Sequence, residues 1–350
     1  MKKTLVALAA ISAVTAAMAD VTIYGNIDQA YQTSTTTDAG VITSKTTKTG
    51  AYQRGQSFLG FKGEEDLGNG MKASFLYEFG LQTETSSTTT NRQSYVGLSG
   101  GFGALRIGKQ YSSSFNNLVG ADPLGATGGA GALYLMVNTS NNGSESPLRQ
   151  DNAIQYDLPT LAAGLKVTLT KVYAGADTTT DTTSDTYVNG AKVGDSQGYS
   201  LSYASGPFNV GLTADSTKAQ DINLGSLLTV VDAGAATTTK QTTVAAGYDL
   251  GVVKVTFADA KVMNEGEGIK TTMYGISAPM GALTLLATTS NGKIVLDSGN
   301  LSMKGNQYGF NYAMSKRTVA YVHVGNTTIT DTDASTYKIK GYGIGVHHSF

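Results

Sequence analysis

The chain has 350 residues, a formal net charge of −1 and no cysteine, which excludes a disulfide framework, a thiolate metal site and a cysteine nucleophile. The 25 basic and 26 acidic residues form no basic block, so nothing indicates nucleic-acid binding. Only 15% of residues are charged and 43 are glycine, against roughly 25% charged and about 7% glycine in an average domain. This composition argues against an ordinary helical or α/β enzyme, and 40% hydrophobic content is too high for a disordered chain.

Residues 1–19 have the pattern of a secretory signal peptide. Two lysines precede an apolar stretch over residues 5–14, and Ala17 and Ala19 occupy the small-residue positions that signal peptidase reads. We expect cleavage after Ala19, which leaves one mature domain over residues 20–350 with a net charge of −3, since two lysines are lost. No later apolar run reaches the roughly 18 residues of a transmembrane helix, so we expect export without a helical anchor.

The mature chain alternates between apolar and polar residues in steps of two. Over residues 71–82 the odd positions are apolar, and the even positions are polar or small except Leu76. The same alternation returns at 199–203, 208–213, 307–314 and 342–350. Period two is the pattern of a strand with one apolar and one wet face, and no helical stripe of three turns interrupts it. The sequence therefore predicts an all-β chain.

The connections between the expected strands are of two kinds, which alternate along the chain. Seven are short turns, at 64–70, 100–103, 157–164, 205–207, 249–251, 279–281 and 315–316. Eight are long and rich in Thr, Ser, Asp and Gly, near 34–50, 83–91, 111–147, 175–196, 216–239, 262–268, 291–302 and 325–335. Fifteen connections join sixteen strands. Short turns on one side and long loops on the other are typical of an antiparallel transmembrane β-barrel in an outer membrane.

The two faces of the expected strands differ as a barrel requires. The polar face is rich in Ser, Thr, Asn and Gly with isolated charges, which fits a water-filled lumen better than the surface of a soluble sandwich. Aromatic residues lie toward strand ends, as in a girdle at the membrane interfaces. They include Tyr24, Tyr31, Tyr77, Phe79, Tyr156, Tyr173, Tyr203, Tyr248 and Tyr342.

Isolated basic residues inside the strands are the charges that a lumen would use. Four of them fall on the face opposite to the apolar residues of their own strands, so we expect them to face the lumen: Arg54, Lys62, Arg106 and Arg149. Arg92 is ambiguous, because Tyr95 and Val96 compete for the lipid face. Lys109 breaks the parity of Arg106, but it lies where the chain leaves its strand for the longest loop.

Six features in chain order resemble the Gram-negative general porins, in particular the branch of beta-proteobacterial and neisserial species. They are residues 21–25, 59–70, 92–98 (RQSYVGL), 105–111 (LRIGKQY), 312–318 and the terminal Phe350; within them, Met314 stands where relatives often carry Leu. The resemblance covers the whole mature chain. It implies a homotrimer of sixteen-stranded barrels in the Gram-negative outer membrane, with the third loop of each folded into its pore and Phe350 read by the barrel-assembly machinery. Small residues expected on the outward face, Gly25 and Gly97, would let neighbouring barrels pack closely.

The resemblance also implies that the residues at Lys109 and Arg149 line the pore constriction. Loop 3 offers only Asp122 and Glu145 as opposing acids, and the Pro-acid-aromatic-Gly tip of some relatives is replaced by residues 122–125 (DPLG). We expect the constriction to draw on the following residues: Arg54, Arg92, Arg106, Lys109, Asp122, Glu145 and Arg149.

We predict no catalytic site, cofactor or metal site. The glycine-rich stretch 125–131 lacks the Lys-Ser/Thr and the βαβ context of a phosphate-binding loop. His347 and His348 are adjacent on a strand and should point to opposite faces, so they do not easily share an ion. His323 is the only other histidine and no G-x-S-x-G motif occurs, which gives a serine hydrolase little support.

These observations predict a channel for passive diffusion of ions and small hydrophilic solutes through the outer membrane. More basic than acidic candidates surround loop 3, which predicts a weak to moderate preference for anions. Two alternatives belong to other classes. An exported adhesive or structural β protein such as a solenoid would show a fixed short repeat, and a secreted β-sandwich hydrolase would need clustered carboxylates. The connections here vary widely in length, and the acids are scattered.

Overall fold

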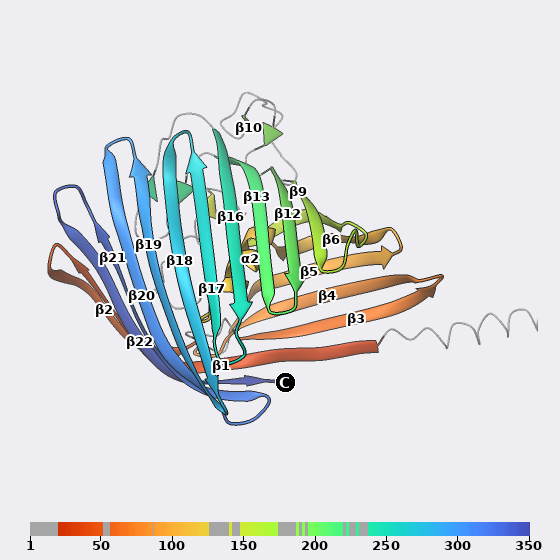
Figure 1. Ribbon diagram of the computed structural model, residues 1–350, viewed down its shortest axis with the longest axis horizontal. Helices are drawn as coiled ribbons and strands as arrows, with labels where there is room; N and C mark the ends of the chain where they lie inside the picture. Colours follow the sequence, from red (N-terminus) through yellow and green to blue (C-terminus); the bar gives the residue numbers. More distant parts are fainter. Residues whose placement is uncertain are drawn as a thin grey trace, which may run out of the picture.

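The computed structural model describes most of residues 20–350, and nearly all of that part is β-strand (Figure 1). The described residues are 20–51, 57–85, 87–125, 140–141, 148–173, 187–188, 191–192, 195–219, 222–223, 229–230 and 237–350. The expected signal peptide with Ala17 and Ala19, and the pore candidates Arg54 and Glu145, lie outside them.

The strands that form the wall are long and follow one another along the chain. They are β1 (Asp20–Asp38), β2 (Val41–Gly50), β3 (Phe58–Gly68), β4 (Met71–Gln82), β5 (Ser87–Gly100), β6 (Gly103–Tyr111), β8 (Arg149–Asp157), β9 (Leu165–Val172), β12 (Ser196–Ser205), β13 (Phe208–Ala219), β16 (Thr237–Asp249), β17 (Lys254–Asn264), β18 (Glu267–Met280), β19 (Leu283–Leu296), β20 (Gly299–Ala313), β21 (Thr318–Thr330) and β22 (Thr336–Ser349). The connections carry helix α2 (Ser113–Ala121) and the two-residue strands β7 (Ser140–Asn141), β10 (Tyr187–Val188), β11 (Ala191–Lys192), β14 (Ile222–Asn223) and β15 (Thr229–Val230). None of the helices in the described residues has the length and apolar character of a membrane span.

The wall is a closed antiparallel barrel. Except for β2 and β3, each wall strand pairs with the next along the chain, and β22 closes the ring on β1. Strands β2 and β3 pair with the same edge of β1, so the two count as one position in the ring. The 17 strands of the sheet thus form sixteen positions, which confirms the predicted barrel. A single closed sheet is neither a solenoid nor a sandwich.

The short turns are as predicted, whereas three of the connections predicted to be long loops are different. All seven predicted short turns join neighbouring wall strands. Three of the eight predicted long loops are instead extended hairpins, whose strands are separated by only two residues, at 39–40, 265–266 and 297–298. At the first two of these, both turn residues have positive φ, as a tight hairpin turn requires. Of these three segments only the first, within residues 34–50, is rich in Thr, and Thr favours strands even where both faces are polar.

Alternation across the wall follows the prediction, with two exceptions. The outward face carries exposed apolar side chains such as Leu212 and Val244. The side chain of Tyr24 points inward, since its hydroxyl donates to Glu78 over 2.9 Å, so its assignment to the aromatic girdle is wrong. The outward placement of Gly97 is also wrong: a Cβ there would meet Ser74 Oγ at 2.8 Å on the inner side.

Helix α2 follows β6 and lies against the inner face of the wall (Figure 1). Ser112 caps it, its side chain accepting a hydrogen bond from the Phe115 amide over 3.1 Å. The Asn117 amide donates to the Gly211 carbonyl over 3.1 Å and to the Thr243 hydroxyl over 2.8 Å. Since Gly211 and Thr243 alternate with the exposed residues of β13 and β16, the described part of this long connection contacts the interior of the barrel.

Part of the inner wall is apolar, whereas the sequence predicts a polar lumen face on every strand. Leu118 and Ala121 of α2 pack there and are 0% and 4% exposed. The apolar wall patch consists of the residues that form one buried cluster with them: Ala245, Ala258, Ala260, Val262, Ile269, Met273, Ile294, Met303 and Ile329. It extends from β16 to β21, so this side of the lumen serves as a packing surface for α2.

Candidate pore constriction

Two arginines and a tyrosine from three neighbouring strands meet on the inner side of the wall. The Arg92 guanidinium donates a hydrogen bond to the Tyr111 hydroxyl over 2.6 Å, and the Arg149 guanidinium donates to the same oxygen over 3.1 Å. Arg149 also lies over the Tyr111 ring, 4.9 Å from its centroid. Arg92, Tyr111 and Arg149 are called the arginine–tyrosine cluster below.

The two arginines of this cluster differ in their counter-charges. Arg92 pairs with Glu78, with 3.5 Å between Nε and Oε2, and both side chains are at most 10% exposed. Arg149 has no carboxylate oxygen within 4.0 Å in the part of the chain that the structure describes. One carboxylate therefore faces two guanidinium groups, which leaves a positive excess where low-dielectric walls strengthen its field.

A β-bulge turns Arg92 toward the interior. Residues 91–94 of β5 stand opposite residues 77–79 of β4, so that β5 contains one extra residue. Val96 faces outward and is 62% exposed, and strict alternation from it would also place Arg92 outside. The extra residue reverses the parity, which resolves the ambiguity between Tyr95 and Val96 in the sequence.

A second charged group lies on the same inner wall, on β6, β8 and β9. The Asp157 carboxylate accepts a hydrogen bond from Arg106 Nη1 over 2.9 Å and pairs with Lys166 Nζ at 3.1 Å. Arg106 also donates to the Gln155 and Gln110 side-chain oxygens, over 3.2 and 3.0 Å. Arg106, Asp157 and Lys166 are called the Asp157 cluster. Again one carboxylate faces two cations.

Lys109 lies in a different setting. Register pairs it with Ser94, and a register shift between Gly108 and Gln110, where Gly108 has a φ of 136°, interrupts the alternation between Ile107 and Tyr111. Its ammonium group pairs with the Asp151 carboxylate at 2.6 Å. This pair shares no residue with the arginine–tyrosine cluster.

Asp122 lies at the far end of α2. It is 7% exposed, and its carboxylate accepts a hydrogen bond from the Leu124 amide over 2.9 Å. The next residue, Pro123, packs on β18, where a Cβ at Gly275 would lie 2.7 Å from the proline ring. In the ring of sixteen positions β18 is the twelfth, and β5, which carries Arg92, is the fourth. Asp122, as the neighbour of Pro123, therefore lies half a turn around the barrel from Arg92.

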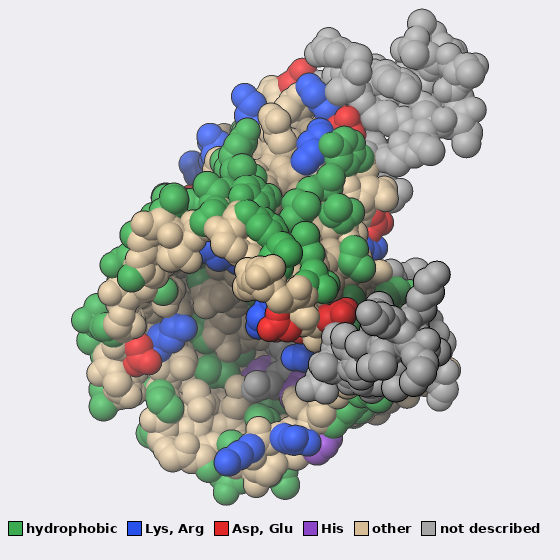
Figure 2. All heavy atoms as spheres, turned by 90° about the vertical axis from the view of Figure 1, so that its right-hand side faces the viewer, with side chains coloured by type: hydrophobic (Ala, Val, Ile, Leu, Met, Phe, Trp, Pro, Cys, Tyr) green, Lys and Arg blue, Asp and Glu red, His purple; other side chains and the backbone are tan. Residues whose placement is uncertain are grey.

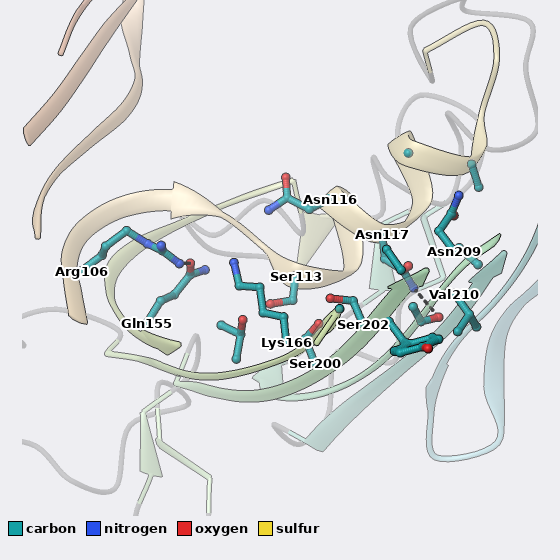
Figure 3. Close-up of a pocket in the computed structure, with 18 residues that line it drawn as sticks. Arg106, Ser113, Asn116, Asn117, Gln155, Lys166, Ser200, Ser202, Asn209 and Val210 are labelled. Atoms are coloured by element: carbon teal, nitrogen blue, oxygen red, sulfur yellow. Dashed lines mark hydrogen bonds between the residues drawn. The ribbon is translucent and has the colours of Figure 1, made fainter. Parts of the chain in front are cut away.

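A cavity of about 300 Å³ with many polar lining residues lies beside α2, bordered by the inner faces of β8, β9, β12 and β13. Figure 3 shows Arg106, Gln155 and Lys166 toward one end of it, and Asn209 toward the other. The space-filling view shows a hollow in the molecule, with charged and histidine side chains at and within its rim and hydrophobic side chains over much of the surrounding surface (Figure 2). Charged side chains therefore border water-accessible space inside an apolar exterior.

The C-terminal histidines point to opposite faces, as predicted. His347 is 9% exposed and its Nδ1 lies 3.4 Å from the Asp28 carboxylate in the interior. His348 is exposed and bonds to the Thr318 hydroxyl over 2.9 Å. The described residues contain no group of three or more His, Cys, Asp or Glu side chains placed to bind a metal ion.

A family model described as Gram-negative porin matches residues 4–332. The chain belongs to this family. Outer membrane porin protein 32 of Delftia acidovorans is 31% identical over 371 residues, which cover 98% of this chain and 94% of that protein. Major outer membrane protein P.IB of Neisseria meningitidis is 48% identical over 112 residues, so the match spans only 34% of that protein and 31% of this porin.

Solved structures give the same fold. An anion-selective porin from Comamonas acidovorans aligns with a TM-score of 0.78 at 23% identity, covering 95% of this porin and 100% of that chain. OmpF of Salmonella typhi aligns with a TM-score of 0.63 at 14% identity, covering 95% and 100%. The relatives and the closed barrel place this porin in the Gram-negative outer membrane.

The structure distributes the predicted pore residues of this porin over several settings. Arg92 and Arg149 share one cluster, Arg106 belongs to a second, and Lys109 and Asp122 lie apart from both. Sequence reasoning missed four members of these clusters: Glu78, Tyr111, Asp157 and Lys166. Strand parity could have found Glu78, an even position within residues 71–82, whereas the contacts of Tyr111 and Lys166 depend on strand register.

Proposed function

We propose that this porin forms a water-filled channel for passive diffusion of ions and small hydrophilic solutes, with a weak to moderate preference for anions. The observation that carries the proposal is the charge of the two inner clusters. They contain four cationic side chains and two carboxylates. The excess positive charge is fixed on the wall, where it attracts anions more strongly than loop charges screened by salt within roughly 8 Å.

The constriction in this proposal lies between the arginine–tyrosine cluster and the loop that carries α2. Asp122, half a turn away around the ring, supplies the opposite charge for a transverse field that would orient dipolar solutes. The name of the solved relative, an anion-selective porin, supports the sign of the preference.

The reversal potential in a planar bilayer under a KCl gradient tests the selectivity. We expect chloride to be more permeant than potassium in the wild type, and Arg149→Gln to shift the reversal potential toward the cation value. Lys316→Gln removes an exposed charge from a short turn and serves as the matched control. A wild type that clearly prefers potassium would refute the proposed sign, and failure to form any channel would refute the function itself.

We also propose a homotrimer whose first strands lie near the threefold axis. Val21 and Ile23 on β1 and Val96 on β5 are each more than half exposed on the outer face, and a neighbouring barrel could cover them. The small residues do not contribute, since Gly97 points inward and the Phe350 ring covers Gly25. Mass measurement of the detergent-solubilised protein tests this: only monomers would count against it.

We further propose that Phe350 helps the barrel to assemble. Its amide donates to the Gly25 carbonyl over 3.1 Å, and its carbonyl accepts from the Gly25 amide over 3.2 Å, so it adds one more pair to the seam between β1 and β22. Its ring would lie 2.8 Å from a Cβ at Gly25. Deletion of Phe350 should lower the folded outer-membrane fraction. Normal assembly of the deleted chain would refute the proposal.

A further inference from the structure

The cavity beside α2 is bordered by four neutral polar side chains that have no partner of their own. They are Ser113 of α2, Ser200 and Ser202 of β12, and Asn209 of β13, and Figure 3 shows the three serines around its middle. None of the four side chains makes a hydrogen bond with another residue that the structure describes. Their hydroxyl and amide groups can therefore bind a molecule inside the cavity.

Strand register brings a charged group to the same place on the wall. Ser202 pairs with Lys166 of β9, and Ser200 lies two residues farther along the same face of β12. Side chains directly opposite each other in an antiparallel pair are neighbours, so the Lys166 ammonium group and the two hydroxyls share one space. Helix α2 closes this space on the other side, since Asn117 bonds to Gly211, the partner of Ser202 on β13.

The charges at the cavity leave one positive excess. The Asp157 carboxylate pairs through Oδ2 with both Arg106 and Lys166, and its Oδ1 accepts a hydrogen bond from the Thr168 hydroxyl over 2.6 Å. Both of its oxygens are thus engaged. The Lys166 ammonium group has three N–H donors and this single ion-pair partner among the described residues, and its side chain is 56% exposed. It can bind a further acceptor in the cavity.

The cavity lies between α2 and the short turns. Gly164 and Asn209 are among its lining residues, and they adjoin the turns at 157–164 and 205–207. Short turns lie on the periplasmic side of an outer-membrane barrel. In the proposed channel, a solute that has passed the loop with α2 therefore meets this cavity before it reaches the periplasm.

The neutral groups and the single excess charge define the ligand that would fit. Hydroxyl and amide groups both donate and accept hydrogen bonds, as the hydroxyls of a sugar do. One positive excess matches a carboxylate, with its single negative charge, better than a phosphate ester, which carries about −1.5 to −2 at pH 7. A volume of about 300 Å³ lies at the lower end for small-molecule sites, so the ligand is small.

We infer that this cavity binds a monosaccharide acid of the gluconate type. Its carboxylate would accept a hydrogen bond from the Lys166 ammonium group, and its hydroxyls would exchange hydrogen bonds with the serines and with Asn209. This binding site presupposes the proposed channel and names a class of solute for it. Retention beside α2 would concentrate such acids on the periplasmic side of the constriction.

The test compares three solutes as inhibitors of the single-channel KCl current of the full-length protein. D-gluconate carries both the carboxylate and the hydroxyls, D-glucose carries only hydroxyls, and acetate carries only the carboxylate. We expect gluconate to halve the wild-type current at about a tenfold lower concentration than either of the other two, because it alone uses both the ammonium group and the neutral groups.

The site variant is Ser200→Ala/Ser202→Ala, which removes two hydroxyls and no charge. We expect its half-inhibiting concentration of gluconate to rise about tenfold, since two hydrogen bonds are lost. Its reversal potential in the KCl gradient should remain at the wild-type value. The control variant, Ser44→Ala/Ser302→Ala, removes two exposed hydroxyls from β2 and β20 and should leave the half-inhibiting concentration unchanged.

Equal inhibition by gluconate and acetate, or by gluconate and glucose, would overturn the assignment of a sugar acid. Equal half-inhibiting concentrations in the site and control variants would show that gluconate does not bind in this cavity. If the site variant fails to insert, Asn209→Ala replaces it, and an unchanged value there would refute the site as well. Any of these results in a channel that still prefers chloride refutes the cavity site alone, whereas a chain that forms no channel refutes the proposed function too.

Discussion

The two halves of the inner wall differ in what they contact. The apolar wall patch of β16 to β21 packs against α2 through Leu118 and Ala121. The wall from β4 to β9 carries the arginine–tyrosine cluster and the Asp157 cluster, and it borders a polar cavity. The same strand geometry thus supplies a packing surface on one side and a charged surface on the other. The apolar half holds α2 in place through Leu118 and Ala121, and in the proposed channel this position would set how close solutes come to the charged half.

The largest effect should follow from breaking the apolar half. Leu118 is fully buried, so Leu118→Asp would place a charge among apolar side chains at a cost of several kcal/mol, more than the helix contacts can offset. We expect α2 to detach and single-channel conductance to rise. Asn116→Asp, on the exposed side of the same helix, introduces the same charge as a control and should change conductance little. Unchanged conductance in Leu118→Asp would mean that α2 does not limit the pore.

A smaller effect should follow from loosening the polar contacts of α2. A Cβ at Gly211 would lie 2.0 Å from Asn117 Oδ1, so Gly211→Ala must displace Asn117 from its two hydrogen bonds. We expect a loss of about 1–3 kcal/mol, measured as a lower midpoint of heat-induced unfolding in detergent. Gly101→Ala has open space around its Cβ and should leave the midpoint unchanged. Equal midpoints for both variants would contradict the close approach.

A change in the charged half should increase the preference for chloride rather than reduce it. Glu78→Gln removes the carboxylate beside Arg92, while the amide can still accept the hydrogen bond from Tyr24. We expect a modest shift of the reversal potential toward chloride, opposite in sign to that of Arg149→Gln. Glu265→Gln, at a hairpin tip, removes the same charge far from the lumen and serves as the control. A shift toward potassium would show that Arg92 does not act on the permeating ions.

We expect the smallest effect at Lys109, and its size tests whether this residue belongs to the constriction. Family resemblance assigns it to the constriction, whereas its ion pair with Asp151 shares no residue with the arginine–tyrosine cluster. We expect the shift of Lys109→Gln in the KCl gradient to be below a third of that of Arg149→Gln. Equal shifts would return Lys109 to the constriction and would require its side chain to reach the lumen.

Short-range patterns predicted the scaffold well. Alternation over residues 71–82 and the seven short turns were sufficient for a barrel of sixteen positions, because parity decides the face of each residue in a strand without a bulge. The helix was missed because it has only nine residues, and its apolar positions, Phe115, Leu118 and Val119, span barely more than one turn. Ser112 before this short apolar pattern was the available signal.

The sequence by itself determined the all-β class, the sixteen strands and their alternation, since these depend on residues close in the chain. Only the tertiary structure decided which charges meet. Arg92 points inward because of a bulge between two strands, and Arg149 meets Tyr111 because β8 returns beside β6 after the long loop. Register and bulges arise from pairing between distant segments, and local alternation does not contain that information.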